Sequence, residues 1–248
     1  MSKLMKYEFR KTLATKLILL GITAVAEIAF LLGLYLEKTR LLATSVAILT
    51  LLAIGGILMI GLGSILIFHR DINTKQSYML FMTPNSCYKI LGAKVIENGL
   101  SILLGGAFFF TLGAIDIALL FAKEGNIQEM WKWIEDLIHS INKNIQLDAK
   151  GLACVTFGLL SSWIATVTTA YLAEAVSAAL LNGKKYNGVL SFALFLVITI
   201  LLSWLGQKAT QAIVSVNLGF LIQGGIFLLA SGLMYVATAQ TMERKLSV

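Results

Sequence analysis

Four acidic residues lie inside long apolar stretches of this chain: Glu27, Glu97, Asp116 and Glu174. A carboxylate at the centre of a membrane costs about 3 kcal/mol, so each of these side chains is expected to face protein or water instead of lipid. Such groups can form a polar pathway through a membrane or a latch between two conformations. The alternative is a structural role, in which Glu97 and Glu174 reach the inner surface or pair with nearby lysines. Those lysines are Lys94, Lys184 and Lys185.

The motifs of nucleotide and metal catalysis are missing from the sequence. The segment 182–185, Asn-Gly-Lys-Lys, lacks the first glycine and the hydroxyl residue of a phosphate-binding loop. There is no His-Glu-x-x-His motif and no paired-cysteine spacing, and His69 and His139 are expected on opposite sides of a membrane. Cys87, in a loop, and Cys154 are expected to remain free thiols without a role. We therefore expect no enzymatic activity and no cofactor in this chain.

The composition is that of a polytopic membrane protein. Hydrophobic residues make up 58% of the chain and the mean hydropathy is +0.83, against about 45–50% apolar residues in ordinary soluble domains. The first apolar run is long enough, as a helix, to cross the roughly 30 Å of a bilayer core. The fold class predicted is all-α, a single transmembrane domain with six spans. The spans are 17–36, 41–68, 90–121, 150–181, 188–205 and 216–240.

The distribution of basic residues predicts the orientation of these spans. With the N-terminus inside, 13 of the 20 lysines and arginines fall in cytoplasmic segments and seven in outer loops. Basic residues are enriched on the cytoplasmic side of membrane proteins. We therefore expect a multi-pass protein of the plasma membrane with both termini in the cytoplasm. The net charge of +7 is accounted for by this orientation, and we expect no nucleic-acid partner.

The polar segment 69–86, between spans two and three, contains the only proline of the chain, Pro84. Asp71 is a candidate N-cap of a short helix over 71–82, because its side chain can accept from a free backbone N–H. Pro84 would end this helix, since the residue before a proline disfavours helical geometry. Ser86 can cap the next helix. The apolar cluster at 78–82 predicts a docking surface for a cytoplasmic partner.

Two further segments have a helical pattern outside the spans. Residues 1–16 predict a basic amphipathic helix in the plane of the membrane surface, the alternative being a disordered tail that only sets topology. Residues 122–149 predict an amphipathic helix on the outer side, resting on lipid or covering the spans. Its apolar stripe comprises Ile127, Trp131, Ile134, Ile138, Ile141 and Ile145. Packing is the favoured role of this segment, and substrate handling is the alternative.

Small residues predict where the spans pack against protein. In span four they form two columns at intervals of four, which let helices approach closely in lipid. The columns are Ser162, Thr166, Ala170, Glu174 and Ala178, and Thr169, Ala173 and Ser177. Glycines in spans two and six can add close contacts or bends. They are Gly55, Gly56, Gly61 and Gly63, and Gly219, Gly224, Gly225 and Gly232.

The beginning Lys-Tyr-Glu-Phe-Arg-Lys-Thr at 6–12 and the loop phrases at 71–78 and 83–86 resemble those of small bacterial permeases. Together with six spans, they make the chain similar to the transmembrane permease subunit of type-2 ABC exporters. The resemblance implies an elbow helix at 1–16 and a coupling helix at 71–82 that binds a cytoplasmic ATPase. It also implies a minor second contact at 182–187. The implied coupling residues are Arg70, Asp71, Lys75, Tyr78, Leu80 and Phe81.

The resemblance implies the following function and partners. Two permease chains, as a homodimer or heterodimer, would bind two ATPase subunits that carry the ATP and magnesium. The assembly would export a peptide, a lipid or a hydrophobic drug. Members of this family usually have re-entrant helices between spans five and six, whereas the segment 206–215 is short and the longest outer segment is 122–149.

Two other functions stay open from the sequence. The first is a non-transporting membrane scaffold, such as an immunity or sensor protein whose loop recruits a cytoplasmic partner. The second is an ion-coupled carrier, which predicts inverted repeats or broken helices with ligands at the midplane. Neither of these two features is evident in the sequence.

Overall fold

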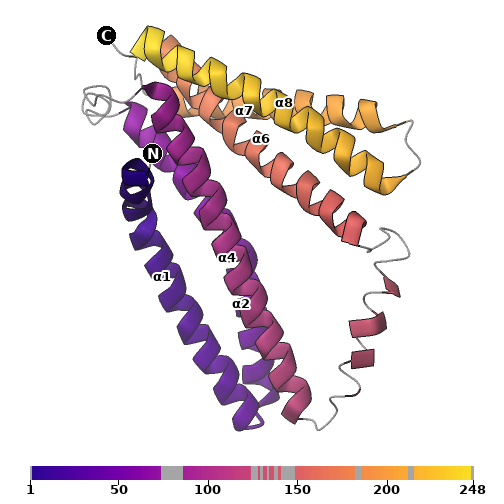
Figure 1. Ribbon diagram of the computed structural model, residues 1–248. Coiled ribbons are helices and arrows are strands. Elements are labelled where there is room, and N and C mark those ends of the chain that lie inside the picture. The colour runs from indigo at the N-terminus through magenta and orange to yellow at the C-terminus, as the bar shows by residue number, and fades with distance from the viewer. Residues whose placement is uncertain are drawn as a thin grey trace. The chain divides into compact units, whose positions relative to one another are not determined.

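The structure, a computed structural model, describes most of the chain. The described residues are 2–73, 86–123, 128, 131, 132, 134–136, 139, 140, 149–181, 186–211 and 215–246. Their regular secondary structure is entirely helical, as the sequence predicts. The helices are α1 (Ser2–Tyr35), α2 (Thr39–Asn73), α4 (Cys87–Lys123), α6 (Ala149–Leu181), α7 (Asn187–Thr210), α8 (Val216–Thr241) and the π-helix η1 (Met242–Leu246) (Figure 1).

Six helices among the described residues are long and apolar enough to cross a membrane. They correspond to the six predicted spans, and each helix is longer than its predicted span. Cys87 is the first residue of α4 and is buried, so its placement in a loop was wrong. The backbone N–H groups of Lys89 and Ile90 donate to the carbonyl of Ser86, which precedes α4 as a cap residue would. Which membrane these helices cross, and in which direction, stays a prediction.

The chain divides into two compact units. Unit 1 comprises Met1–Ser64 and Ile96–Ile134, and unit 2 comprises Ile65–Val95 and Glu135–Val248. The long helices α2 and α4 therefore contribute one part to each unit. We describe each unit by itself.

Unit 1 is built on a single face of α1 that packs against α2 and α4 (Figure 1). The buried and half-buried positions of this face recur at intervals of three and four, the repeat of one helical face. They are Glu8, Thr12, Lys16, Leu19, Thr23, Ala26, Phe30 and Leu34. We call them the α1 stripe. It is polar toward the N-terminus and apolar toward the C-terminus, where it joins a hydrophobic cluster with Leu49 of α2 and Leu112 of α4.

The structure has no break between residues 1–16 and the first span. α1 is continuous, and its first turns run in a different direction from the rest (Figure 1). The side chains that these turns bury are Glu8 and Thr12, whereas Met5 and Phe9 are half-buried and Leu13 is 48% exposed. The polar side of this segment thus packs on protein. Its contact with a membrane surface stays a prediction.

The turn between α1 and α2 brings two backbones unusually close together. A Cβ atom on Gly33 would lie 2.8 Å from the backbone nitrogen of Leu42. Glu37 has a φ of 55°, and Lys38 donates its N–H to the carbonyl of Gly33 at 3.1 Å. A residue in the left-handed region and such a backward hydrogen bond are typical of a helix C-terminus. Gly33 is therefore required by the close approach of Leu42.

Unit 2 is organised around α6, which packs against α8 and α7 (Figure 1). Its hydrophobic cluster includes Phe68 of α2 and Tyr171 of α6, whose ring centroids are 4.4 Å apart, and Met242 of η1. The two predicted columns of small residues in span four are buried or half-buried, as expected of a face that packs on protein. Gly224 of α8 approaches Phe157 closely, whereas Gly225 has open space at its Cβ.

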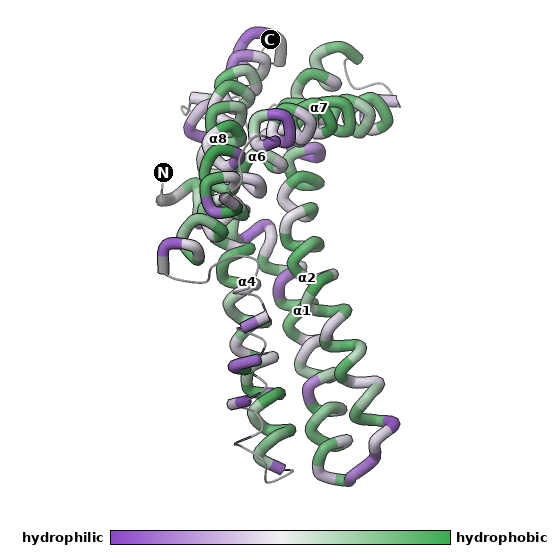
Figure 2. Tube along the Cα trace, turned by 90° about the vertical axis from the view of Figure 1, so that its right-hand side faces the viewer, coloured by the Kyte–Doolittle hydropathy of each residue, from purple (hydrophilic) through white to green (hydrophobic). Residues whose placement is uncertain are grey.

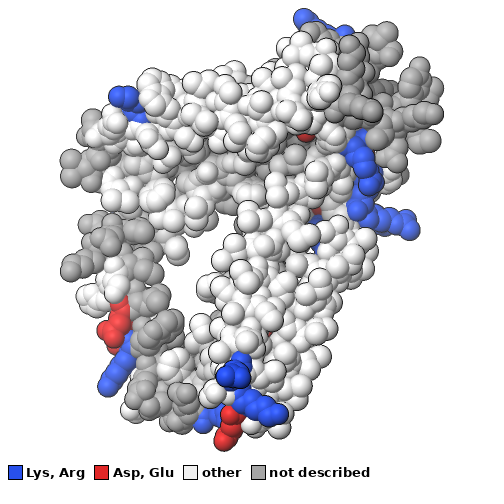
Figure 3. Space-filling view, turned by 180° about the vertical axis from the view of Figure 1, so that it is seen from behind, with Lys and Arg blue, Asp and Glu red and all other residues white. Residues whose placement is uncertain are grey.

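The outward sides of the helices are apolar. Figure 2 shows polar residues at the turn between α1 and α2 and mainly hydrophobic residues along the lengths of these helices. Large apolar side chains stand largely exposed there, for example Val25, Leu51 and Phe110. On the face shown in Figure 3, charged side chains gather mainly at the helix ends. Exposed apolar surface on this scale is unfavourable in water and suits hydrocarbon.

Replacing Gly33 by alanine is expected to destabilise unit 1, because the new methyl group meets backbone atoms of Leu42 that cannot rotate away. Overpacking of this kind costs about 1–3 kcal/mol. The matched control is Gly21→Ala on the same helix, where the added Cβ meets nothing within 4 Å. Thermal unfolding of the detergent-solubilised protein should show a lower midpoint for Gly33→Ala only. Equal midpoints for the two variants would contradict the close approach.

Candidate functional site: the carboxyl groups of the apolar helices

Each carboxyl group that the sequence places in an apolar helix meets a partner from a different helix. In unit 1, Glu97 of α4 pairs with Lys16 of α1, and Glu27 of α1 meets Asp116 of α4. In unit 2, Glu174 of α6 pairs with His69 of α2. Of the lysines expected to pair with Glu97 and Glu174, Lys94 binds Asp71 instead, and Lys184 and Lys185 lie outside the described residues.

Glu97 is the centre of a polar network between α1 and α4. Its Oε1 atom accepts hydrogen bonds from the Nζ of Lys16, the Oγ1 of Thr12 and the Oγ of Ser101, each at 2.8 Å. Lys16 also donates to Ser101 at 2.6 Å, and its ammonium lies 4.2 Å from the ring centroid of Phe9. Only 2% of the Glu97 side chain is exposed. Three donors on one oxygen stabilise the charged carboxylate in this buried position.

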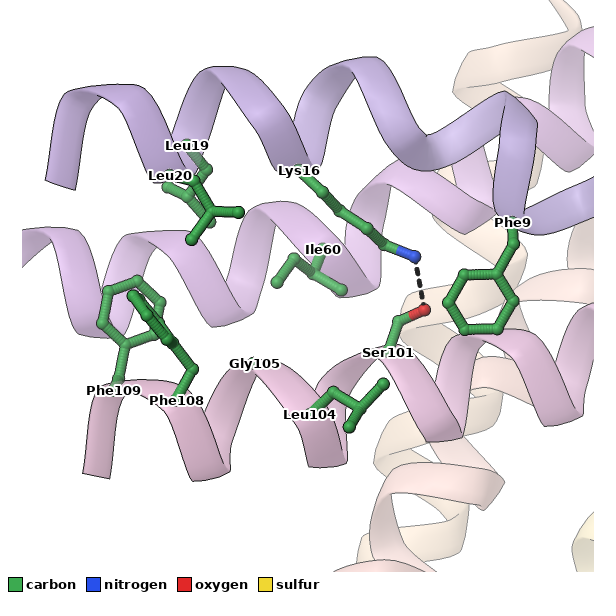
Figure 4. A pocket seen from close by; sticks show the side chains of 10 residues that line it. All are labelled: Phe9, Lys16, Leu19, Leu20, Ile60, Ser101, Leu104, Gly105, Phe108 and Phe109. Atoms are coloured by element: carbon green, nitrogen blue, oxygen red, sulfur yellow. Dashed lines mark hydrogen bonds between the residues drawn. The ribbon is translucent and has the colours of Figure 1, made fainter. Parts of the chain in front are cut away.

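A cavity of about 210 Å³ lies beside this network. Figure 4 shows Lys16, Ser101 and Phe9 at one end and Phe108 and Phe109 at the other. The rest of the lining is apolar and comes from α1, α2 and α4. It comprises Leu19, Leu20, Ile60, Leu104 and Gly105. The ammonium of Lys16 is already bound by Glu97 and Ser101, so the cavity presents a mainly hydrocarbon surface.

Glu27 and Asp116 form the second polar contact of unit 1. Their carboxyl groups are neighbours that interact with one another across the two helices. Asp116 is buried, with 8% exposed, and its Oδ1 atom has no hydrogen-bond partner in the described part of the chain. The same holds for the Oε2 atom of Glu27. Glu27 has no partner on its own helix, and Asp116 of α4 is its neighbour.

Asp116 also lines a separate cavity of about 290 Å³ between α1, α2 and α4. Apart from Asp116 and Thr50, this cavity is bounded by apolar residues and a glycine. They are Phe30, Val46, Leu49, Ala53, Phe109, Leu112, Gly113, Ile117 and Leu120. An incompletely satisfied carboxyl group at the wall of an apolar cavity is a candidate binding site.

Two ion pairs of unit 2 lie at the helix ends that border residues 74–85. The Nζ of Lys94 donates to the Oδ2 of Asp71 at 2.6 Å, and the side chains are 1% and 4% exposed. His69 Nδ1 lies 2.7 Å from Oε2 of Glu174. Asp71 belongs to the last turn of α2, which continues to Asn73, so it does not begin a separate helix as expected. Its carboxylate pairs with Lys94 of α4. This pairing offsets the cost of burying the lysine charge.

Several predicted site residues lie outside the described residues. They are Lys75, Tyr78, Leu80 and Phe81 of the expected coupling helix. Arg70 is described and lies in the last turn of α2. Of the outer segment 122–149, Trp131 and Ile134 are helical, and most of the predicted stripe is outside the described part. No group of three or more potential metal ligands occurs in the described part, and Cys87 and Cys154 are both free thiols.

Sequence reasoning missed the basic and hydroxyl partners in these networks. A usable signal was present, because polar residues share one face of the apolar helix α4 at intervals of three and four. They are Lys94, Glu97, Asn98 and Ser101. All four are buried, and the side-chain amide of Asn98 donates to the carbonyl of Gly61 at 3.0 Å. Thr12 and Lys16 show the same spacing of four on α1.

No family model, curated protein or solved structure matches this chain. The class of protein is therefore defined by the fold alone. The six apolar helices of the described residues indicate a multi-pass membrane protein.

Replacing Glu97 by glutamine is expected to cost about 3 kcal/mol, because it leaves the partly buried ammonium of Lys16 without a counter-charge. Lys16→Met should also destabilise, and the double variant should lose clearly less than the sum of the two. Thermal or denaturant unfolding in detergent measures this double-mutant cycle. Glu37→Gln is the control, since the Glu37 side chain is 80% exposed, its distance to Lys123 is 3.5 Å, and a surface pair contributes about 1 kcal/mol or less. Additive effects at Lys16 and Glu97 would contradict the pairing.

Proposed function

We propose that this chain is the membrane-spanning permease subunit of an ATP-binding-cassette exporter of the type-2 class. Cytoplasmic ATPase subunits would bind the loop around 71–82 and hydrolyse ATP. This chain, with a second identical or related permease chain, would export a peptide, lipid or hydrophobic drug. The ATP and magnesium would be bound by the partner ATPase. Both termini and the loop would lie on the cytoplasmic side of a bacterial plasma membrane.

The observation that supports this proposal is a pair of contacts at the helix ends that border the loop. Asp71 and Lys94 join the end of α2 to the beginning of α4 and are almost fully buried, and His69 and Glu174 join α2 to α6. The buried charges of Asp71 and Lys94 resist separation, because parting two buried charges is costly. A force applied to residues 74–85 would therefore act on three helices of unit 2 together. A loop that serves only as a connector would not require such ties.

The mechanism follows from linkage between two conformations. Closure of the ATPase subunits on ATP would favour one arrangement of the loop, and the ties at Asp71 and Glu174 would carry this preference into α4 and α6. ATP shifts the equilibrium only by the difference in its effect on the two arrangements. The predicted contact residues are the aromatic and apolar side chains Tyr78, Leu80 and Phe81, with Arg70 and Lys75 at their edge. Buried aromatic residues commonly dominate binding at such interfaces.

Replacing Tyr78 and Phe81 together by alanine is expected to uncouple the ATPase. The chain should be purified with a tag from the membranes of its own host, and ATP hydrolysis of the co-purified subunits measured in lipid nanodiscs. We expect hydrolysis to fall by about tenfold or more, since aromatic hot spots each contribute 2 kcal/mol or more to binding. Tyr35→Ala with Leu36→Ala is the matched control. These two exposed side chains lie at the C-terminal end of α1 and in the turn that follows it. Their replacement should leave hydrolysis unchanged.

Unchanged hydrolysis in the Tyr78 and Phe81 variant would contradict the proposal and favour a scaffold that only recruits a cytoplasmic protein. Absence of any co-purified ATPase would contradict it as well.

A cysteine at Phe81 is expected to react with a membrane-impermeant maleimide only after cells are opened, because the loop would face the cytoplasm. The background is a chain in which Cys87 and Cys154 are replaced by alanine, since both are free thiols. A cysteine at Lys38, in the turn between α1 and α2, is the control and should react in intact cells. Labelling of the Phe81 position in intact cells would place the loop outside and exclude ATPase coupling through it.

A further inference from the structure

The cavity at Asp116 combines an apolar wall with an acidic group that lacks part of its hydrogen bonding. Helices α1, α2 and α4 supply the wall, with the rings of Phe30 and Phe109 among the lining residues. Its volume of about 290 Å³ is near the lower end of small-molecule sites, which span roughly 300–1,000 Å³. A molecule of one aromatic ring and a short chain matches this size.

The acidic group is a pair of neighbouring carboxyls, Asp116 in the cavity wall and Glu27 beside it. Asp116 Oδ1 and Glu27 Oε2 are both buried and have no hydrogen-bond partner in the described residues. A buried polar atom without a partner loses the hydrogen bonds it made to water. The pair therefore favours any ligand that brings hydrogen-bond donors to these two oxygens.

Two basic side chains of unit 1, Lys16 and Lys123, are bound by groups other than Glu27 and Asp116. Lys16 pairs with Glu97, while Lys123 donates to the carbonyl of Leu34 and lies 3.5 Å from Glu37. The Glu97 site thus has a lysine from its own chain, whereas the Glu27–Asp116 contact consists of two acids. A positive charge is the component that this second site lacks.

We propose that the cavity at Asp116 binds a small amphiphilic cation, a protonated primary amine on an apolar body. Its ammonium would donate to the carboxyl of Asp116, which neighbours Glu27, and its apolar part would fill the cavity beside Phe30 and Phe109. An ammonium has three donors and no acceptor, which matches two acceptor oxygens. Aromatic rings at the cavity add a favourable interaction with a cation. This inference is independent of the proposed exporter function.

Other occupants fit the site less well. An anion would be repelled by the acidic pair, and a neutral hydrocarbon would leave both carboxyl oxygens without donors. A divalent metal ion prefers about six or more oxygen ligands. The described lining offers the carboxyl of Asp116 and the hydroxyl of Thr50, which already donates to the carbonyl of Val46 at 2.9 Å. The amine is the occupant that uses both the charge and the apolar wall.

The test is equilibrium binding of tritiated phenylbutylamine to the purified full-length chain in detergent, measured by scintillation proximity. Binding should be saturable, and phenylbutanol, which has the same shape without the charge, should compete at least about tenfold less well. Asp116→Asn removes the charge with little change of volume and should weaken binding by about tenfold or more. Glu37→Gln removes an exposed carboxylate of the same unit and should leave binding unchanged.

A second variant tests the cavity without touching the acids. Gly113 lines the cavity, and a Cβ there meets nothing within 4 Å. Gly113→Leu should therefore fill the space, retain the fold and abolish saturable binding. The proposal is overturned if wild type binds no amine saturably, or if phenylbutanol competes equally. Unchanged binding in folded Gly113→Leu overturns it too, and so does unchanged binding in folded Asp116→Asn.

Discussion

The cost of placing a charge in an apolar environment is the constraint on which this structure depends. Acidic and basic side chains occur along helices whose outer surfaces are hydrocarbon, so each must find a partner across a helix boundary. Glu97 with Lys16 and Asp71 with Lys94 are such partners; the first contact is partly buried and the second almost fully buried. Because breaking a buried pair is far more costly than forming it is favourable, these contacts specify which helices lie together. They do so where apolar packing alone discriminates poorly, since lipid is as apolar as the helix faces.

The α1 stripe shows how polar and apolar contacts divide this task along one helix. Near the N-terminus, Thr12 and Lys16 fix α1 to α4 through directed hydrogen bonds to one carboxylate oxygen. Near the C-terminus, Phe30 and Leu34 pack in a hydrophobic cluster, and Gly33 lets the backbone of α2 approach. Hydrogen bonds set the register of the helices, because their geometry tolerates little sliding. The apolar end then fills the remaining space without needing a unique partner.

The sequence was sufficient for the six apolar helices of spanning length, because apolar runs of this length are a strong local signal. It also predicted the packed face of α6 from its columns of small residues. It did not predict that Lys94 binds Asp71 and not Glu97. Glu97 is close to Lys94 in the sequence, whereas Asp71 is 23 residues away on α2, so the pairing depends on which helices pack together. The N-cap prediction for Asp71 failed for a related reason, since its burial against Lys94 keeps it within α2.

The acidic contacts of this chain differ in whether their charge is balanced by the chain itself. At Glu97, and at Asp71, a lysine completes the site, and the result is a fixed joint between helices. At Glu174 the partner is His69, whose charge depends on its protonation. At Asp116 the partner is another acid, so the contact is complete only when a proton or an external cation is present. A helix contact that requires something from outside the chain can respond to it, whereas a lysine–carboxylate joint cannot. The carboxyl pair of unit 1 is for this reason the contact best suited to sensing a ligand.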